Sequence, residues 1–152
     1  KGPVLEKVIT ECARIKARVV EKDEYDTKDV RIKLNFGHTL GHAVEAASGY
    51  AGSHSHGESV ALGMVLAGEI AVRLGLFRER DLGRMKDLIG RAGLPLTVSG
   101  VSLEDIMRAY GNDKKFISGA NRFVLPRRIG RVQVVEDIPE VLIRTVLGEY
   151  VE

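Results

Sequence analysis

Three of the four histidines in this 152-residue chain are spaced so that they can act on one ligand. His38 and His42 are four residues apart, which on a helix puts both imidazoles on the same side. His56 follows a glycine-containing turn, and a hairpin of two helices would bring it to the first pair. Imidazoles bind divalent metals and exchange protons near neutral pH. The spacing therefore predicts a metal or substrate site, although a histidine pair of this kind also occurs as two independent surface residues.

The polar residues around the first pair favour chemistry over simple solvation. A single helix over residues 31–45 would place five side chains on one stripe: Arg31, Asn35, His38, His42 and Glu45. A solvent-facing stripe normally carries paired Lys and Glu, whereas guanidinium, amide and imidazole groups bind anions, hydroxyls and metals. We therefore predict one helix here, with a polar face that lines a site.

Two further features indicate how this helix is packed. Gly37 and Gly41 would each cost about 1 kcal/mol relative to Ala inside a helix, so we expect a backbone or a neighbouring helix to approach them closely. Residues 56–75 form a helix that is apolar nearly all round, which predicts a buried position at the centre of a bundle. Glu58 either matches the positive end of that helix or supports His56 by hydrogen bonding. His54 is expected to be an ordinary loop residue.

The remaining elements follow from periodicity and from start and stop signals. Residues 3–21 have helical apolar spacing, and Cys12 lies in that stripe as a small buried hydrophobe. Residues 21–29 form a charged, exposed connector, and residues 112–115 interrupt regular structure. Further helices are expected over residues 78–92, 102–110 and 139–150, with a β-hairpin over 122–125 and 131–135. The prediction is a mainly α fold, a multi-helix bundle with a small β-hairpin.

Composition limits the possible functions. Hydrophobic residues make up 44% of the chain, enough for the core of a single domain. Twenty-three basic residues nearly balance 21 acidic ones and are dispersed, so we expect no nucleic-acid partner. One cysteine fits a reducing compartment, and no apolar run is long enough to cross a bilayer. We expect a cytoplasmic protein without a membrane partner.

A longer set of motifs identifies a family. The string Asn35-Phe-Gly-His-Thr-Leu-Gly-His-Ala-Val-Glu45, followed by His56-Gly-Glu-Ser-Val-Ala-Leu-Gly-Met64, closely resembles the 3-dehydroquinate synthases. The likeness continues in the lysine-bearing segment that starts at Lys16, in Asp113-Lys-Lys115 and in Arg122-Phe-Val-Leu-Pro126. The chain is short for that family and has no Gly-rich dinucleotide fingerprint. Residues 1–152 are thus expected to be a single C-terminal metal- and substrate-binding domain, without the N-terminal NAD-binding domain.

The resemblance implies a reaction and a set of roles. The family converts a seven-carbon keto-acid phosphate to 3-dehydroquinate with loss of phosphate, using NAD and a divalent metal, Zn²⁺ or Co²⁺. By this likeness His38 and His56 are metal ligands, and a third ligand, a glutamate, lies upstream of this chain. Catalytic and substrate-binding roles fall on Lys16, Arg31, Asn35 and His42. Lys115 is a further substrate-binding candidate, with Lys114 and Arg122 as alternative cations.

Other interpretations stay open at this stage. A related sugar-phosphate cyclase or a metal-dependent alcohol dehydrogenase would share the metal and NAD. A non-catalytic helical module with structural histidines is a different class altogether. We expect the chain to be inactive without its NAD-binding partner domain, and apolar surface that this domain would cover predicts homo-oligomers.

Overall fold

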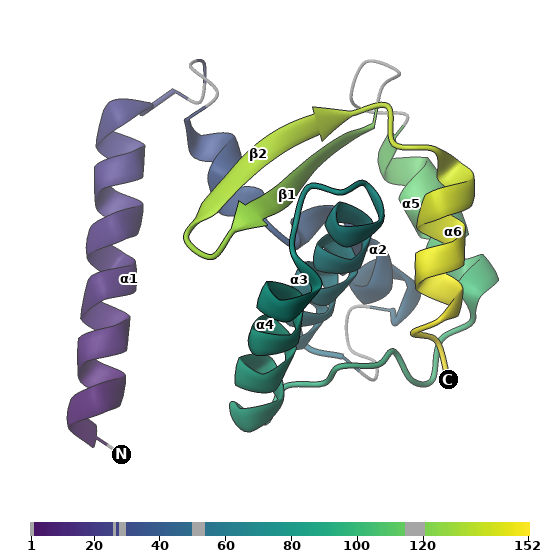
Figure 1. Ribbon diagram of the computed structural model, residues 1–152, viewed down its shortest axis with the longest axis horizontal. Helices are drawn as coiled ribbons and strands as arrows, with labels where there is room; N and C mark the ends of the chain where they lie inside the picture. Colours follow the sequence, from purple (N-terminus) through teal and green to yellow (C-terminus); the bar gives the residue numbers. More distant parts are fainter. Residues whose placement is uncertain (1, 26, 28–29, 50–53, 115–120) are drawn as a thin grey trace. The chain divides into compact units, whose positions relative to one another are not determined.

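A computed structural model of the chain describes residues 2–25, 27, 30–49, 54–114 and 121–152, with Asp113 and Lys114 described by their backbone alone (Figure 1). The chain divides into two compact units, Lys1–Asn35 and Phe36–Glu152, which are described separately. In the described residues, no helix combines the length and apolar character needed to cross a membrane.

The first unit holds α1 (Gly2–Lys22) and the 3₁₀ helix η1 (Arg31–Asn35). The helix predicted over residues 3–21 is confirmed, but none of its residues is buried, and the predicted burial of Cys12 is wrong. Apart from η1 and the connecting segment, the unit offers α1 nothing to pack against. The apolar stripe of α1 is consequently exposed, with Val8 51% accessible and Ile9 59% accessible.

One acidic residue of the connector between these helices, Asp23, is buried. Asp23 is only 1% accessible, and its carboxylate accepts hydrogen bonds from the backbone N–H groups of Thr27, Val30 and Arg31 at 2.8, 2.9 and 3.3 Å. One of these donors is Arg31, the first residue of η1. The backbone N–H groups in the first turn of a helix have no acceptor inside the helix. The prediction of a wholly exposed connector is therefore wrong at Asp23.

The predicted single helix over residues 31–45 is also wrong, because the backbone breaks at Gly37. This residue has φ 83° and ψ −12°, a left-handed conformation that cannot be part of an α-helix interior. η1 ends at Asn35, and α2 (His38–Ala47) begins after the break. The predicted polar stripe is therefore divided, with Arg31 and Asn35 on one helix and His38, His42 and Glu45 on the next.

The second unit is built around α3 (His56–Arg73), as its apolar composition predicts. α3 packs against α2, α4 (Glu79–Arg91), α6 (Glu140–Gly148) and the first strand of a hairpin formed by β1 (Arg122–Arg128) and β2 (Arg131–Glu136). The largest fully buried side chains come from α2, α3, β1, α6 and the helix over residues 103–114: Leu40, Leu62, Leu66, Ile70, Ile106, Phe123, Leu125, Ile143 and Leu147. The mainly α fold with a small β-hairpin is confirmed.

α5 (Leu103–Lys114) begins where predicted and runs further than predicted. The hydroxyl of Ser102 accepts a hydrogen bond from the backbone N–H of Asp105 at 3.1 Å, which confirms the capping residues. The predicted interruption at residues 112–115 is wrong for residues 112–114, which continue the helix. α5 packs against α2 and α6, so tertiary contact extends a helix that local sequence does not favour.

One partly buried polar network joins α3, α4 and the C-terminal segment. The ammonium group of Lys86 and the hydroxyl of Tyr150 both donate to the carboxylate of Glu69, and Lys86 lies over the Tyr150 ring. Burial alone raises the pKa of Glu69, but the hydrogen bonds from Lys86 and Tyr150 outweigh it and lower the pKa below 4.5.

This network predicts a pH-dependent contribution to stability. Because the folded-state pKa of Glu69 lies below its unfolded value, the contribution is complete above about pH 4.5 and is lost as the pH falls through the folded-state pKa. At pH 7, Glu69→Gln should lower the free energy of unfolding by about 1 kcal/mol, a modest value because solvent screens the pair. Urea titrations at pH 7 and pH 3.5 measure the difference. Glu149→Gln, in the exposed pair with Arg73, is the control, and an equal effect of both variants would contradict the prediction.

Candidate metal centre

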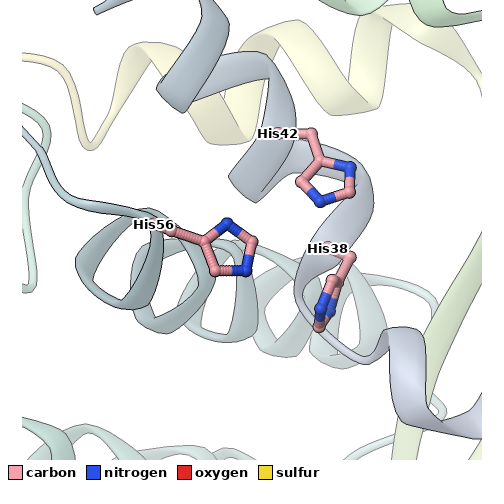
Figure 2. A group of neighbouring side chains, drawn as sticks. All are labelled: His38, His42 and His56. Carbon is pink, nitrogen blue, oxygen red and sulfur yellow. The ribbon is translucent and has the colours of Figure 1, made fainter. Parts of the chain in front are cut away.

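The second unit brings three imidazoles together, as the sequence predicts. His38 and His42 lie one turn apart on α2, and His56 is the first residue of α3 (Figure 2). Ring centroids are 5.3 Å apart for His38 and His42, 5.9 Å for His38 and His56, and 5.8 Å for His42 and His56. One nitrogen from each ring lies within 4.8 Å of the others. The two helices thus form a common site from residues on both.

Glycines permit the close packing of α2 on α3 that this convergence requires. A Cβ atom on Gly63 of α3 would lie 1.8 Å from the carbonyl oxygen of Gly37, and one on Gly41 would lie 2.8 Å from the carbonyl oxygen of Ser59. Such distances are far below van der Waals contact, so no side chain fits at either position. The predicted close approach at Gly37 and Gly41 is confirmed.

The start of α3 is fixed by a capping box. The hydroxyl of Ser55 accepts from the backbone N–H of Glu58, and the Glu58 carboxylate accepts from the backbone N–H of Ser55 at 2.8 Å. Hydrogen bonds from the side chain and backbone of Ser55 lower the pKa of Glu58. Of the two roles considered for Glu58, the structure supports the one at the helix terminus.

His54 is a loop residue, as predicted, but it is a buried one. Its side chain is 5% accessible, and its Nε2 lies within hydrogen-bond distance of both the carbonyl oxygen and the N–H of Ser99, at 3.1 and 3.3 Å. The contact ties the loop before α3 to the segment that follows α4. His54 therefore stabilises the position of His56 without facing it.

The two predicted metal ligands each have one ring nitrogen occupied. Nδ1 of His38 lies 3.3 Å from the carbonyl oxygen of Phe36, and Nδ1 of His56 lies 3.0 Å from a carboxylate oxygen of Glu45. Burial lowers the pKa of His38; the Phe36 carbonyl opposes this shift, while His42 and His56 add to it. A neutral imidazole with Nδ1 hydrogen-bonded presents Nε2 to a metal. The imidazole nitrogens of His38, His42 and His56 are thus a donor set that fits Zn²⁺ or Co²⁺.

A pocket of about 820 Å³ opens beside this centre. Its polar lining comes from α2, α3 and α5: His42, Glu45, His56, Asp105, Arg108 and Asn112. Arg108 donates to Asp105 at 2.7 Å on the α5 side. Arg108 and Asn112 have no signal in the sequence that would predict a place in the pocket, and no specific role was predicted for Glu45. Glu45 had a detectable signal, because it continues the His38 and His42 stripe by one further turn.

The other predicted site residues belong to the first unit, to the hairpin or to the part of the chain that is not described. Lys16 and Asn35 are exposed in the first unit, and the guanidinium group of Arg31 donates to the carbonyl oxygen of Glu24 at 3.1 Å. Lys115 lies outside the described residues, and Lys114 is described by its backbone alone. Arg122, the remaining alternative cation, pairs with Glu136 across the hairpin at 2.9 Å.

Comparisons with known proteins identify the family of the chain. Residues 1–116 match the family 3-dehydroquinate synthase C-terminal. The chain is 46% identical over 148 residues to the 3-dehydroquinate synthase of Nostoc punctiforme, covering 97% of this chain and 40% of the relative. It is 42% identical over 146 residues to that of Desulforamulus reducens, covering 95% of this chain and 40% of the relative. The chain thus spans about 40% of the length of these curated relatives.

Solved structures share the fold. A 2-deoxy-scyllo-inosose synthase in complex with carbaglucose-6-phosphate, NAD⁺ and Co²⁺ superposes with a TM-score of 0.81 at 27% identity, covering 97% of this chain and 42% of that one. The 2-epi-5-epi-valiolone synthase of Streptomyces hygroscopicus, with NAD⁺ and Zn²⁺ bound, has a TM-score of 0.80 at 24% identity, covering 95% and 39%. Sequence, fold and the histidine cluster place this chain in the 3-dehydroquinate synthase family, where it corresponds to the C-terminal part.

Proposed function

We propose that this chain forms the metal- and substrate-binding domain of a 3-dehydroquinate synthase. The reaction converts 3-deoxy-D-arabino-heptulosonate 7-phosphate to 3-dehydroquinate and phosphate, in the shikimate pathway of aromatic amino acid biosynthesis. The observation that carries the proposal is the convergence of His38, His42 and His56, all three from the family motif, beside a pocket. NAD would bind mainly to a domain outside this chain, so the chain alone should be inactive.

The residues divide into metal ligands and substrate contacts. His38 and His56 would hold Zn²⁺ or Co²⁺, together with a glutamate from outside this chain. When bound, the metal supplies a Lewis acid for the substrate hydroxyl that NAD oxidises. His42 faces the pocket one turn from His38, where it can donate or accept a proton during the reaction.

Lys16, Arg31, Asn35 and Lys115 are proposed to bind the charged and hydroxyl groups of the substrate. A guanidinium group suits a carboxylate that accepts two hydrogen bonds, and an ammonium group suits phosphate as a point charge. Arg31 donates to the Glu24 carbonyl through one NH group, and a guanidinium group has further N–H donors for a substrate carboxylate.

We also propose that the protein is a cytoplasmic homo-oligomer. The exposed apolar stripe on α1 is the surface that supports self-association. Sedimentation equilibrium at increasing concentration tests this, and a monomeric mass throughout would refute it.

The test of the proposed reaction is a chimera. This chain replaces the corresponding C-terminal 40% of the Nostoc punctiforme relative. Phosphate release from the seven-carbon substrate and formation of 3-dehydroquinate are then measured with NAD and Zn²⁺. We expect both products, and a loss of at least about 100-fold in kcat in the same chimera with His42→Ala, in the range for loss of an acid or base.

A second outcome would identify a related sugar-phosphate cyclase. The 27% identical fold neighbour is a synthase of a different carbocycle, whereas the relatives at 42 and 46% identity are 3-dehydroquinate synthases. A folded chimera that does not convert the seven-carbon acid phosphate but releases phosphate from glucose 6-phosphate, whose carba analogue is bound in that neighbour, would favour that alternative.

A further inference from the structure

Glu45 is the carboxylate that contacts the metal-binding histidine of α3. Its Oε2 lies 3.0 Å from Nδ1 of His56. The Glu45 side chain is 17% accessible and that of His56 is 58% accessible, so the carboxylate is mostly covered while the imidazole reaches toward the pocket. An ionised carboxylate only accepts hydrogen bonds. The hydrogen of a neutral His56 ring therefore lies on Nδ1, which leaves the lone pair on Nε2.

His38 and His56 differ in the group that accepts a hydrogen bond from Nδ1. His38 is in the same tautomer as His56, because its Nδ1 lies 3.3 Å from the carbonyl oxygen of Phe36, which is also only an acceptor. The acceptor for His38 is neutral, whereas the acceptor for His56 carries a charge. A carboxylate on Nδ1 makes Nε2 the more basic nitrogen and fixes the ring orientation.

A negative charge near His56 would favour cation binding, because His56 lies at the positive end of α3. His56 is the first residue of α3, and the amino end of a helix carries a partial positive charge that opposes the binding of a cation nearby. Glu58 lies in the same first turn but is engaged in the capping box with Ser55. Asp105, across the pocket, pairs with Arg108. Glu45 is thus the carboxylate placed to offset the charge at His56.

We propose that Glu45 is a positioning residue for His56: it holds the Nδ1–H tautomer and keeps Nε2 available as the metal-binding nitrogen. The proposal rests on the proposed function, since it takes His56 as a metal ligand. It assigns to this residue of α2 a role that acts through His56.

The experiment compares the wild-type chain with Glu45→Gln, Glu45→Ala and His56→Ala. Glu58→Gln is the matched control, because glutamine also serves in a capping box while removing one negative charge from the same neighbourhood. Long-range proton–nitrogen NMR of ¹⁵N-histidine protein at pH 8, without metal, reports the tautomer of His56. Calorimetric titration with Zn²⁺ reports affinity, and circular dichroism checks that each variant is folded.

The variants distinguish the hydrogen bond that His56 donates to Glu45 from a general effect of negative charge near His56. Wild type and Glu58→Gln should show His56 mainly as the Nδ1–H tautomer with equal zinc affinity. Glu45→Ala should give a mixture of tautomers and bind zinc about 10- to 100-fold more weakly, the range for loss of such an outer partner. Glu45→Gln, whose amide oxygen still accepts, should keep the tautomer and lose less affinity.

Two results would overturn the proposal in different ways. An unchanged tautomer in Glu45→Ala, or unchanged zinc affinity there while His56→Ala binds weakly, would remove the positioning role and leave the metal ligands intact. Unchanged zinc affinity in His56→Ala would instead refute the proposed ligand set, and the role of Glu45 with it.

Discussion

Zinc binding by this chain is expected to weaken by more than about 100-fold when His38 or His56 is replaced by alanine, and by much less when His42 is replaced. Loss of a metal ligand should reduce zinc affinity by more than the 10- to 100-fold that is typical when a residue hydrogen-bonded to a ligand is lost. His38 and His56 each have Nδ1 hydrogen-bonded and Nε2 available, whereas no hydrogen bond to the His42 ring is found among the described residues. An imidazole without a fixed tautomer suits proton transfer better than metal binding.

Calorimetric titration of the three alanine variants at pH 7.5 tests the assignment. His42 is the matched control, because its ring is as close to His38 and His56 as they are to each other. Abolished binding in His42→Ala with unchanged binding in His56→Ala would place the metal on the α2 pair. The ligand assignment taken from the family would then be wrong.

Zinc affinity should also decrease toward acid pH, because protons compete with the metal for imidazole nitrogens. The pKa of His38 is lowered from 6.5, mainly by burial, so His38 remains neutral and able to bind under more acidic conditions than an exposed histidine. Titrations between pH 8 and pH 5 measure this dependence.

The elements of the fold that were predictable are those with a strong periodic signal. The apolar residues of α3 require a buried helix whatever surrounds it, and the two short segments at 122–125 and 131–135 with a Gly-containing turn between them predict the hairpin. The break at Gly37 has no such signal. The sequence alone does not show whether a glycine adopts helical backbone angles or a φ of 83°. At Gly37 the difference depends on the close approach of α3. The extension of α5 over residues 112–114 likewise depends on tertiary contacts.

In the candidate site, too, some features are predictable from local sequence and others depend on tertiary contacts. The spacing of His38 and His42 predicts that they share a helix face, and this holds because both follow the break at Gly37. The approach of His56 depends on a turn and on two glycine contacts, so the sequence suggests it without determining it. The contact of Glu45 with His56 was not predicted, because the two residues lie on different helices and local spacing does not show which nitrogen of His56 needs an acceptor.

Replacing Gly63 with alanine is expected to cause a large loss of stability. The new Cβ would lie 1.8 Å from the carbonyl oxygen of Gly37, 2.8 Å from its carbonyl carbon and 2.7 Å from the backbone nitrogen of Gly41. All three atoms are backbone, so no side-chain rotation can relieve the contact. The start of α2 must move away from α3.

Overpacking of this kind costs typically 1–3 kcal/mol, and the backbone contacts place Gly63→Ala at about 3 kcal/mol, even after a gain of about 1 kcal/mol in helix propensity. Zinc affinity should decrease as well, because His38 directly follows Gly37 and would move away from His56. Urea-induced unfolding and zinc calorimetry measure the two effects.

Gly83→Ala on α4 is the matched control, since it makes the same substitution inside a helix at an exposed position where the added Cβ has no atom within 4 Å. It should raise the free energy of unfolding by up to about 1 kcal/mol and leave zinc affinity unchanged. The two variants should therefore change stability in opposite directions. A Gly63→Ala protein as stable as Gly83→Ala would mean that α2 and α3 are not held in contact at Gly37, and the convergence of His38 on His56 would lose its structural cause.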